Sequence, residues 1–177
     1  MRRIHIVGGK NQGKTTLVAE LVIELTRRGW RVGTIKHTHH QHELDVPGKD
    51  SFRHREAGAA MVGILTRSLN AVFWSNSLTD GQMEPLSDTR YERFSLMYKD
   101  CDLIVVEGDT RTAAPKLEVW RAELATPPMT SSMANVLAVI SDDRPPGEWH
   151  VLPRGNISQI ADFIVSHFQL VRESNSA

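Results

Sequence analysis

The stretch "IHIVGGKNQGKTT" at residues 4–16 decides the fold. Its first four residues form a short apolar run, which predicts a strand. Glycines and polar residues follow, and these are poor material for a protein core. An apolar pattern resumes from residue 17 and fits one face of a helix, at Leu17, Val18, Leu21, Val22 and Leu25. The stretch therefore predicts a strand, a glycine-rich loop and an amphipathic helix in direct succession.

The loop matches the phosphate-binding pattern G-x-x-x-x-G-K-[ST] at full spacing. Glycines let successive backbone N–H groups point at phosphate oxygens, and the next helix adds its positive N-terminal end. Lys14 supplies a mobile cation for the outer phosphates, and the Thr15 hydroxyl is a ligand for Mg²⁺. An ordinary glycine-rich turn with an exposed lysine is the alternative. The candidate nucleotide-binding residues are Gly8, Gly9, Lys10, Asn11, Gln12, Gly13, Lys14, Thr15 and Thr16.

A second acidic group is expected from "DLIVVEG" at residues 102–108, the clearest buried strand of the chain. Glu107 stands at the carboxyl end of this strand, and α/β sheets bind ligands at the carboxyl ends of their parallel strands. Glu107 is therefore the candidate partner of Thr15 at the metal and a candidate catalytic residue beside Lys14. A solvated carboxylate at a strand end is the alternative.

Strands and helices alternate along most of the chain. Further strands are expected at residues 30–37, 60–66, 70–74, 116–122 and 135–141, and further helices at 51–59, 88–98 and 157–168. Such alternation favours a mostly parallel sheet covered on both faces. The predicted fold is α/β, a three-layer α/β/α P-loop NTPase domain over residues 1–171, with a frayed tail at 172–177.

The composition argues against several other classes of protein, although a local basic patch for nucleic acid stays possible. The 177 residues are 40% hydrophobic and 24% charged, and 21 basic residues balance 21 acidic ones. This balance gives no general attraction to nucleic acid or to a membrane surface. The single cysteine excludes an internal disulfide framework. The chain shows neither the apolar core of a signal peptide nor a run of about 20 apolar residues, so a cytoplasmic protein is expected.

Several blocks in a fixed order resemble the molybdopterin-guanine dinucleotide biosynthesis protein B (MobB) family. They are "GGKNQGKTTL", "IKHTHH" at 35–40, "DVPGKDSFRHREAGA" at 45–59, and "DLIVVEG" followed by "PKLEVWR". The block at 45–59 is the most telling, because it is not a general pattern of nucleotide-hydrolysing proteins.

The resemblance implies a homodimeric GTP-binding protein with weak hydrolysis. Its partners would be molybdopterin and the molybdenum cofactor guanylyltransferase, which joins GMP to molybdopterin. GTP and Mg²⁺ are the implied cofactors. After Gly108 the family usually has an aromatic residue and a lysine, whereas this chain has Asp109 and Thr110, followed by Arg111.

Other candidate residues lie on loops. Lys36 or His37 is expected near the terminal phosphate or the pterin, and a metal site using His37, His39, His40 and His42 is the minority interpretation. Asp45 is a candidate catalytic residue in a loop that could respond to nucleotide. Asp142 is a candidate acceptor for the guanine N–H groups, although a turn formed by Asp142 and Asp143 explains these residues equally well.

Three functions are consistent with these residues. The first is a GTP-binding accessory protein of molybdenum cofactor synthesis with slow Mg²⁺-dependent GTPase activity. The second is a P-loop kinase acting on a small molecule, which would need an acceptor pocket with a base. The third is a nucleotide-gated adaptor without significant catalysis.

Overall fold

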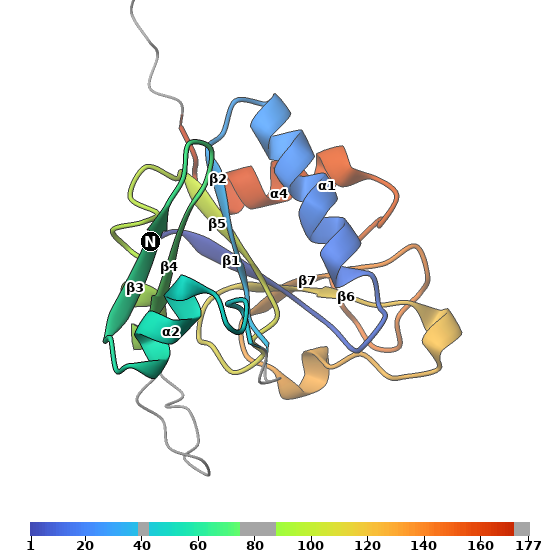
Figure 1. Cartoon of the computed structure of the whole chain (residues 1–177). Coiled ribbons are helices and arrows are strands. Elements are labelled where there is room, and N and C mark those ends of the chain that lie inside the picture. The colour runs from blue at the N-terminus through green and yellow to red at the C-terminus, as the bar shows by residue number, and fades with distance from the viewer. Residues whose placement is uncertain (39–42, 75–87, 172–177) are drawn as a thin grey trace, which may run out of the picture. The chain divides into compact units, whose positions relative to one another are not determined.

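The computed structural model describes residues 1–38, 43–74 and 88–171 (Figure 1). The chain divides into two compact units. The sheet unit comprises the described residues 1–38 and 88–171, and the hairpin unit comprises residues 43–74. The expectation of one domain over residues 1–171 stays a prediction, and the tail expected at 172–177 lies outside the described residues.

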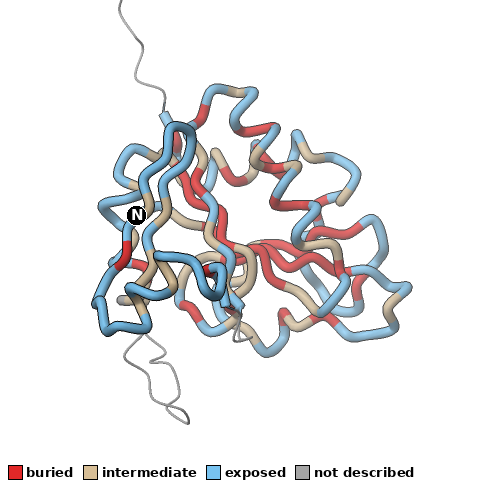
Figure 2. The backbone as a smooth tube through the Cα atoms, in the orientation of Figure 1, coloured by how far each residue is buried: buried red, intermediate tan, exposed pale blue. Residues whose placement is uncertain are grey.

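The sheet unit is built on a six-stranded parallel sheet with the strand order β2-β5-β1-β6-β7-β8. The strands are β1 (Arg3–Val7), β2 (Val32–Lys36), β5 (Leu103–Glu107), β6 (Lys116–Val119), β7 (Val136–Ile140) and β8 (Val151–Leu152). Buried residues follow the central strands, as Figure 2 shows. These strands read as apolar runs in the sequence because a parallel sheet is covered on both faces.

Two helices, α1 (Lys14–Arg27) and α4 (Ile157–His167), cover one face of the sheet (Figure 1). They share a single hydrophobic cluster with strand residues such as Ile4, Ile6 and Leu117. Both helices present apolar residues at helical spacing, so each buries one stripe. Arg28, just after α1, ties the two helices together through ion pairing with Asp162 of α4 at 2.5 Å.

The second face carries a smaller apolar cluster. Tyr91, Ile104 and Val106 form it, and Ile35, Tyr98 and the half-buried Cys101 pack against it. Helix α3 (Thr89–Glu92) supplies Tyr91, and turns continue the chain to β5. We refer to residues 88–101 as the second-face layer. The three-layer α/β arrangement predicted from the sequence is thus confirmed.

The helix expected at 88–98 is wrong beyond Glu92. Most backbone hydrogen bonds after α3 join residues three apart, such as Met97 N–H to Phe94 O, which marks successive turns. Serine and aromatic residues in this segment have only modest helix propensity. Moreover, the Tyr98 hydroxyl donates to Thr34 O at 2.7 Å, so contacts with β2 fix the path of the chain instead.

The hairpin unit contains α2 (Asp50–Glu56), β3 (Met61–Leu65) and β4 (Asn70–Trp74). The two strands were expected, but they pair with each other in an antiparallel hairpin and not with the main sheet. Their connection, residues 66–69, is too short for the crossover that parallel strands need. It is closed by hydrogen bonds between Thr66 and Leu69.

Candidate functional site

The carboxyl ends of β1, β5 and β2 lie side by side and carry the candidate residues. Glu107 of β5 is in register with Ile6 of β1 on one side and with Lys36 of β2 on the other. The Gly8–Thr15 loop begins directly after Val7, the last residue of β1. The parallel topology therefore brings the loop, Glu107 and Lys36 to one edge of the sheet.

Glycine is required at two points of the Gly8–Thr15 loop for different reasons. A Cβ on Gly8 would lie 2.4 Å from the carbonyl oxygen of Val119, so the loop passes directly against β6. Gly13 has open space around it but takes φ 95°, a left-handed conformation that suits glycine. Asn11 is also left-handed, with φ 63°. The loop curls because these positions permit it.

The loop ends at a helix N-terminus that no side chain caps. Gly13 is the N-cap of α1, and α1 has no acidic residue in its first turn. The first N–H groups of any α-helix lack an acceptor within the helix. Together with the helix dipole, these donors make the start of α1 a suitable place for a phosphate group.

Lys14 folds back over the loop that precedes it. Its ammonium group donates to the Gly9 carbonyl oxygen at 2.6 Å. Burial lowers the pKa of Lys14, and Glu107 partly opposes this effect. The side chain thus spans the loop and stays close to the carboxylate at the end of β5.

Thr15, Glu107 and Lys36 form a compact polar group. The Thr15 hydroxyl donates to Glu107 Oε1 at 2.7 Å, and Lys36 Nζ lies 3.5 Å from the same oxygen. Mg²⁺ prefers oxygen ligands, and a hydroxyl beside a carboxylate supplies two. The pairing of Thr15 and Glu107 expected from the sequence is therefore present, and its donor atoms fit the metal.

Gln12 anchors the loop to the connection between β6 and β7, which the sequence did not indicate. The residue is 2% exposed, and its Nε2 donates to Thr126 Oγ1 at 3.1 Å. Trp120 Nε1 donates to Thr126 O, and the buried Glu118 carboxylate accepts two N–H groups of the same connection. In contrast, Lys10 and Thr16 of the candidate loop are exposed.

Asp109, which stands where the family usually has an aromatic residue, holds neighbouring segments together. Its Oδ2 accepts hydrogen bonds from the Tyr91 hydroxyl at 2.6 Å and from Arg90 at 2.9 Å. Burial alone would raise the pKa of Asp109, but these hydrogen bonds outweigh it and hold the pKa at about 2. Asp109 thus fastens the segment after Glu107 to the second-face layer, while Arg111 is exposed.

His5 supports the same segment from within β1. It is fully buried, its Nδ1 lies 3.1 Å from Gly108 O, and Arg3 Nε donates to its Nε2 at 3.3 Å. These partners suit the neutral ring with its proton on Nδ1. Burial lowers the pKa of His5 to about 4. A polar residue inside the apolar run "IHIV" was the signal that sequence reasoning passed over.

Asp45, the candidate catalytic residue, lies in the hairpin unit. It is 6% exposed, and its Oδ1 accepts from the Ser51 hydroxyl at 2.8 Å and from Val46 N–H at 2.9 Å. These contacts fix the start of α2. A catalytic role for Asp45 stays a prediction. Three of the histidines considered for a metal site, His39, His40 and His42, lie outside the described residues.

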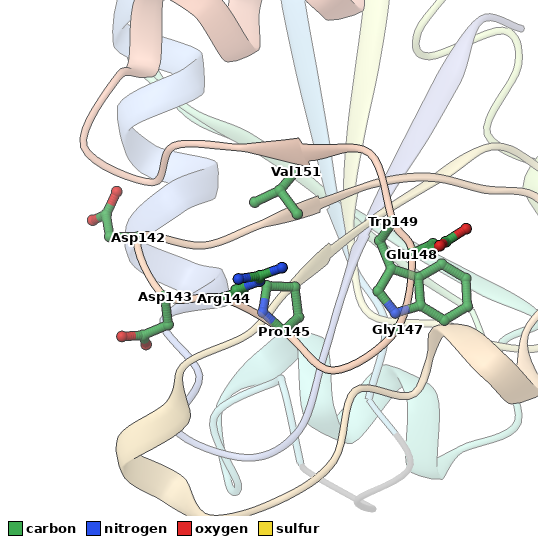
Figure 3. Close-up of a pocket in the computed structure, with 8 residues that line it drawn as sticks. All are labelled: Asp142, Asp143, Arg144, Pro145, Gly147, Glu148, Trp149 and Val151. Carbon is green, nitrogen blue, oxygen red and sulfur yellow. The ribbon is translucent and has the colours of Figure 1, made fainter.

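Asp142 and Asp143 follow the carboxyl end of β7. Asp142 Oδ1 accepts from Gly155 N–H at 3.0 Å, and Asp143 Oδ2 accepts from Ala122 N–H at 2.8 Å. They border a shallow hollow of about 740 Å³ that Trp149 flanks at the other end (Figure 3). Both bonds reach residues 13 and 21 positions away along the chain, so the two carboxylates tie distant segments to the end of β7. Guanine recognition by Asp142 stays a prediction.

Two negative findings apply to the described residues. They contain no group of three or more histidine, cysteine, aspartate or glutamate side chains that could hold a metal ion by themselves. None of their helices combines the length and apolar character that crossing a membrane requires.

Comparisons with known proteins show the family of this chain. The family model described as molybdopterin guanine dinucleotide synthesis protein B matches residues 3–142. A molybdopterin-guanine dinucleotide biosynthesis adapter protein of Haemophilus influenzae is 34% identical over 96% of this chain and 92% of its own. The protein of the same name from Escherichia coli K12 is 33% identical over 89% of this chain and 87% of its own.

Solved structures show the same fold. A MobB protein homolog from Bacillus stearothermophilus has a TM-score of 0.67 at 24% identity, covering 96% of this chain and 99% of that one. A molybdopterin-guanine biosynthesis protein B has a TM-score of 0.65 at 25% identity, covering 95% of this chain and 99% of that one. With the family model matched over most of its length, the chain belongs to the molybdopterin guanine dinucleotide synthesis protein B (MobB) family.

Proposed function

We propose that this chain is a GTP-binding accessory protein of molybdenum cofactor synthesis, assisting the attachment of GMP to molybdopterin. One observation carries the proposal: Lys14, Thr15 and Glu107 lie together at the N-terminus of α1, which no side chain caps. The relatives named as adapter proteins of molybdopterin-guanine dinucleotide biosynthesis supply the pathway.

The Gly8–Thr15 loop would hold the phosphate groups of the nucleotide. Backbone N–H groups of the loop and of the first turn of α1 would donate to phosphate oxygens. The Lys14 ammonium would exchange its bond to Gly9 O for the outer phosphates. Thr15 and Glu107 would hold Mg²⁺, which when bound neutralises phosphate charge.

The base would reach toward the end of β7. Two strand spacings separate β7 from β1, because only β6 lies between them. Neighbouring strands are about 4.8 Å apart, so β7 lies about 10 Å from β1. A carboxylate there can accept from N1 and the 2-amino group of guanine, and adenine offers no such pair of donors. We assign this contact to Asp142.

The chain would act through other molecules to which it binds. The proposed partners are the molybdenum cofactor guanylyltransferase, bound molybdopterin and a second copy of this chain, without nucleic acid or membrane. Hydrolysis would be slow: water attacks the γ-phosphorus, the bond to the β–γ bridging oxygen breaks, and GDP and phosphate form. The proposal includes a cytoplasmic location, which a single unpaired cysteine suits.

Titration calorimetry with GTP, GDP and ATP in Mg²⁺ tests the nucleotide part of the proposal. Lys14→Ala should weaken GTP binding by about 10-fold or more, because a charged donor to phosphate is lost. Lys99→Ala removes an exposed lysine of the second-face layer and is the matched control. Circular dichroism should show an intact fold in both variants, and unchanged GTP affinity in Lys14→Ala would refute the phosphate-binding loop.

Glu107→Gln separates metal-dependent chemistry from binding. A carboxylate in the metal shell acts mainly where charge develops during phosphoryl transfer. We therefore expect the variant to lose Mg²⁺-dependent hydrolysis to a greater extent than GTP affinity. Hydrolysis in Mg²⁺ at the wild-type rate would reduce Glu107 to a structural residue at a strand end.

A further inference from the structure

Two lysines face one carboxylate at the carboxyl edge of the sheet. Lys14 comes from the start of α1 and Lys36 from the end of β2, while Glu107 ends the strand that pairs with β2. The two lysines differ in how they are held. Lys14 is bound to Gly9 O at 2.6 Å, whereas Lys36 lies 3.5 Å from Glu107 Oε1.

Lys36 is the more easily displaced of the two. Its side chain is 66% exposed, whereas that of Glu107 is 14% exposed. An ion pair with one exposed partner and a long N···O distance contributes little free energy. Breaking the pair between Lys36 and Glu107 therefore costs little. A lysine also has a flexible four-carbon stem, which lets its ammonium group reach more than one anion from a fixed Cα.

A divalent cation at Glu107 changes what surrounds Lys36. The oxygen that Lys36 faces is the same Oε1 that accepts from the Thr15 hydroxyl, the second proposed metal ligand. Mg²⁺ held by Thr15 and Glu107 would repel the ammonium group of Lys36. A terminal phosphate brought by the same Mg²⁺ would offer the ammonium group a new negative partner nearby.

We infer that Lys36 is an exchangeable counter-ion of Glu107, which pairs with the carboxylate without nucleotide and transfers to the terminal phosphate when Mg²⁺ occupies Glu107. The exchange makes the site sensitive to the number of phosphates, because a diphosphate leaves Lys36 without its new partner. This inference rests on the proposed function and adds a specificity-determining residue to it.

Nucleotide titrations of Lys36→Gln test the exchange. In Mg²⁺ the variant should bind a non-hydrolysable GTP analogue about 10-fold more weakly, the expected loss of one charged hydrogen bond. Its affinity for GDP should stay within about twofold of wild type. Lys36→Arg should retain most of the triphosphate affinity, and Lys99→Gln is the charge-matched control. Equal losses for GTP analogue and GDP, or no loss for either, would overturn the inference.

A second measurement needs no nucleotide. Mn²⁺ binding, followed by electron paramagnetic resonance, probes the Thr15 and Glu107 oxygens directly. Removing the competing ammonium in Lys36→Gln should raise Mn²⁺ affinity by at least about twofold, and adding Glu107→Gln should abolish the gain. Weaker or equal Mn²⁺ binding in Lys36→Gln contradicts the exchange.

The controls distinguish failure of this inference from failure of the proposed function. If Lys14→Ala weakens triphosphate binding and Lys36→Gln does not, only the role of Lys36 is wrong. If wild-type protein binds no triphosphate, the proposed function fails, and the inference fails with it.

Discussion

At the scale of single residues, hydrogen bonds of Thr15, Gln12 and His5 hold the carboxyl edge of the sheet together. The spacing of glycines, Lys14 and Thr15 marks a loop, and Glu107 is the polar end of an apolar strand. The contact between Thr15 and Glu107 then follows from parallel topology. The partners of Gln12 and His5 could not be found this way, because Thr126 and Gly108 lie more than 100 positions away along the chain.

His5 gives the protein a defined response to acid. Its pKa is lowered by burial to about 4 from 6.5, so the unfolded chain binds a proton more readily than the folded one. Stability from the neutral ring is complete above pH 6.5 and is lost as the pH falls toward 4. The change is roughly 2–3 kcal/mol over this window.

Urea unfolding at pH 7, 5.5 and 4.5 measures this response. The protonated ring would direct Nε2–H at the Arg3 guanidinium, so protonation breaks the contact on Nε2, whereas Nδ1–H still donates to Gly108 O. Wild type should lose stability across the series, and His5→Gln, less stable at pH 7, should show a flatter dependence. Identical slopes for the two proteins would assign the acid response to other groups. Asp109 is not one of them in this series, because its lowered pKa costs stability only below pH 4.

At the scale of elements, the connection between β6 and β7 is the part that sequence reasoning explained least. It contains two short 3-10 turns, η1 (Ala122–Leu124) and η2 (Thr130–Ser132), and no long helix. Its path is fixed by the carboxylate of Glu118, which accepts from Met129 N–H and Thr130 N–H. Strand β8 was missed because two residues are too few to show a periodic pattern.

The bond between Gln12 and Thr126 makes this connection a support for the Gly8–Thr15 loop. Thr126→Val keeps the shape of the side chain but removes the acceptor for Gln12 Nε2. The expected result is a loss of about 1 kcal/mol in stability, with weaker GTP binding. Thr26→Val, at an exposed position of α1, is the control and should leave nucleotide affinity unchanged. Calorimetric titration and urea unfolding of both variants decide whether the connection supports the loop.

At the scale of the whole molecule, the fold agreed with the sequence wherever apolar runs were long. Five of the six parallel strands, all except β8, and the helices α1 and α4 follow from such runs. The separate hairpin unit could not be predicted from apolar runs. Strands β3 and β4 have ordinary strand sequences, and only the short turn between them indicates that they pair with each other. Long-range partnership is a property of the folded chain that local patterns do not carry.

The isolated protein should hydrolyse GTP slowly. Efficient hydrolysis requires a positioned water as well as cations at the phosphates, and the sequence shows no motif for a residue that orients water. An arginine finger adds about 10³–10⁵ in rate where one acts. Turnover by the purified chain should therefore fall well below about 10 s⁻¹, the median for enzymes. A steady-state phosphate-release assay measures it, with and without the guanylyltransferase and molybdopterin. Rapid turnover alone would reject an accessory role, and phosphate transfer to a small acceptor would indicate a kinase.

The half-buried Cys101 in the second-face layer provides a built-in reporter of motion. It is the single thiol of the chain, so an alkylating reagent labels one position without any mutation. Burial raises the pKa of this thiol, which keeps the reactive thiolate scarce while the layer is closed. The rate of labelling therefore records how often residues 88–101 lift from the sheet. Comparing that rate with and without nucleotide would show whether nucleotide binding at the carboxyl edge changes the motion of residues 88–101 on the second face of the sheet.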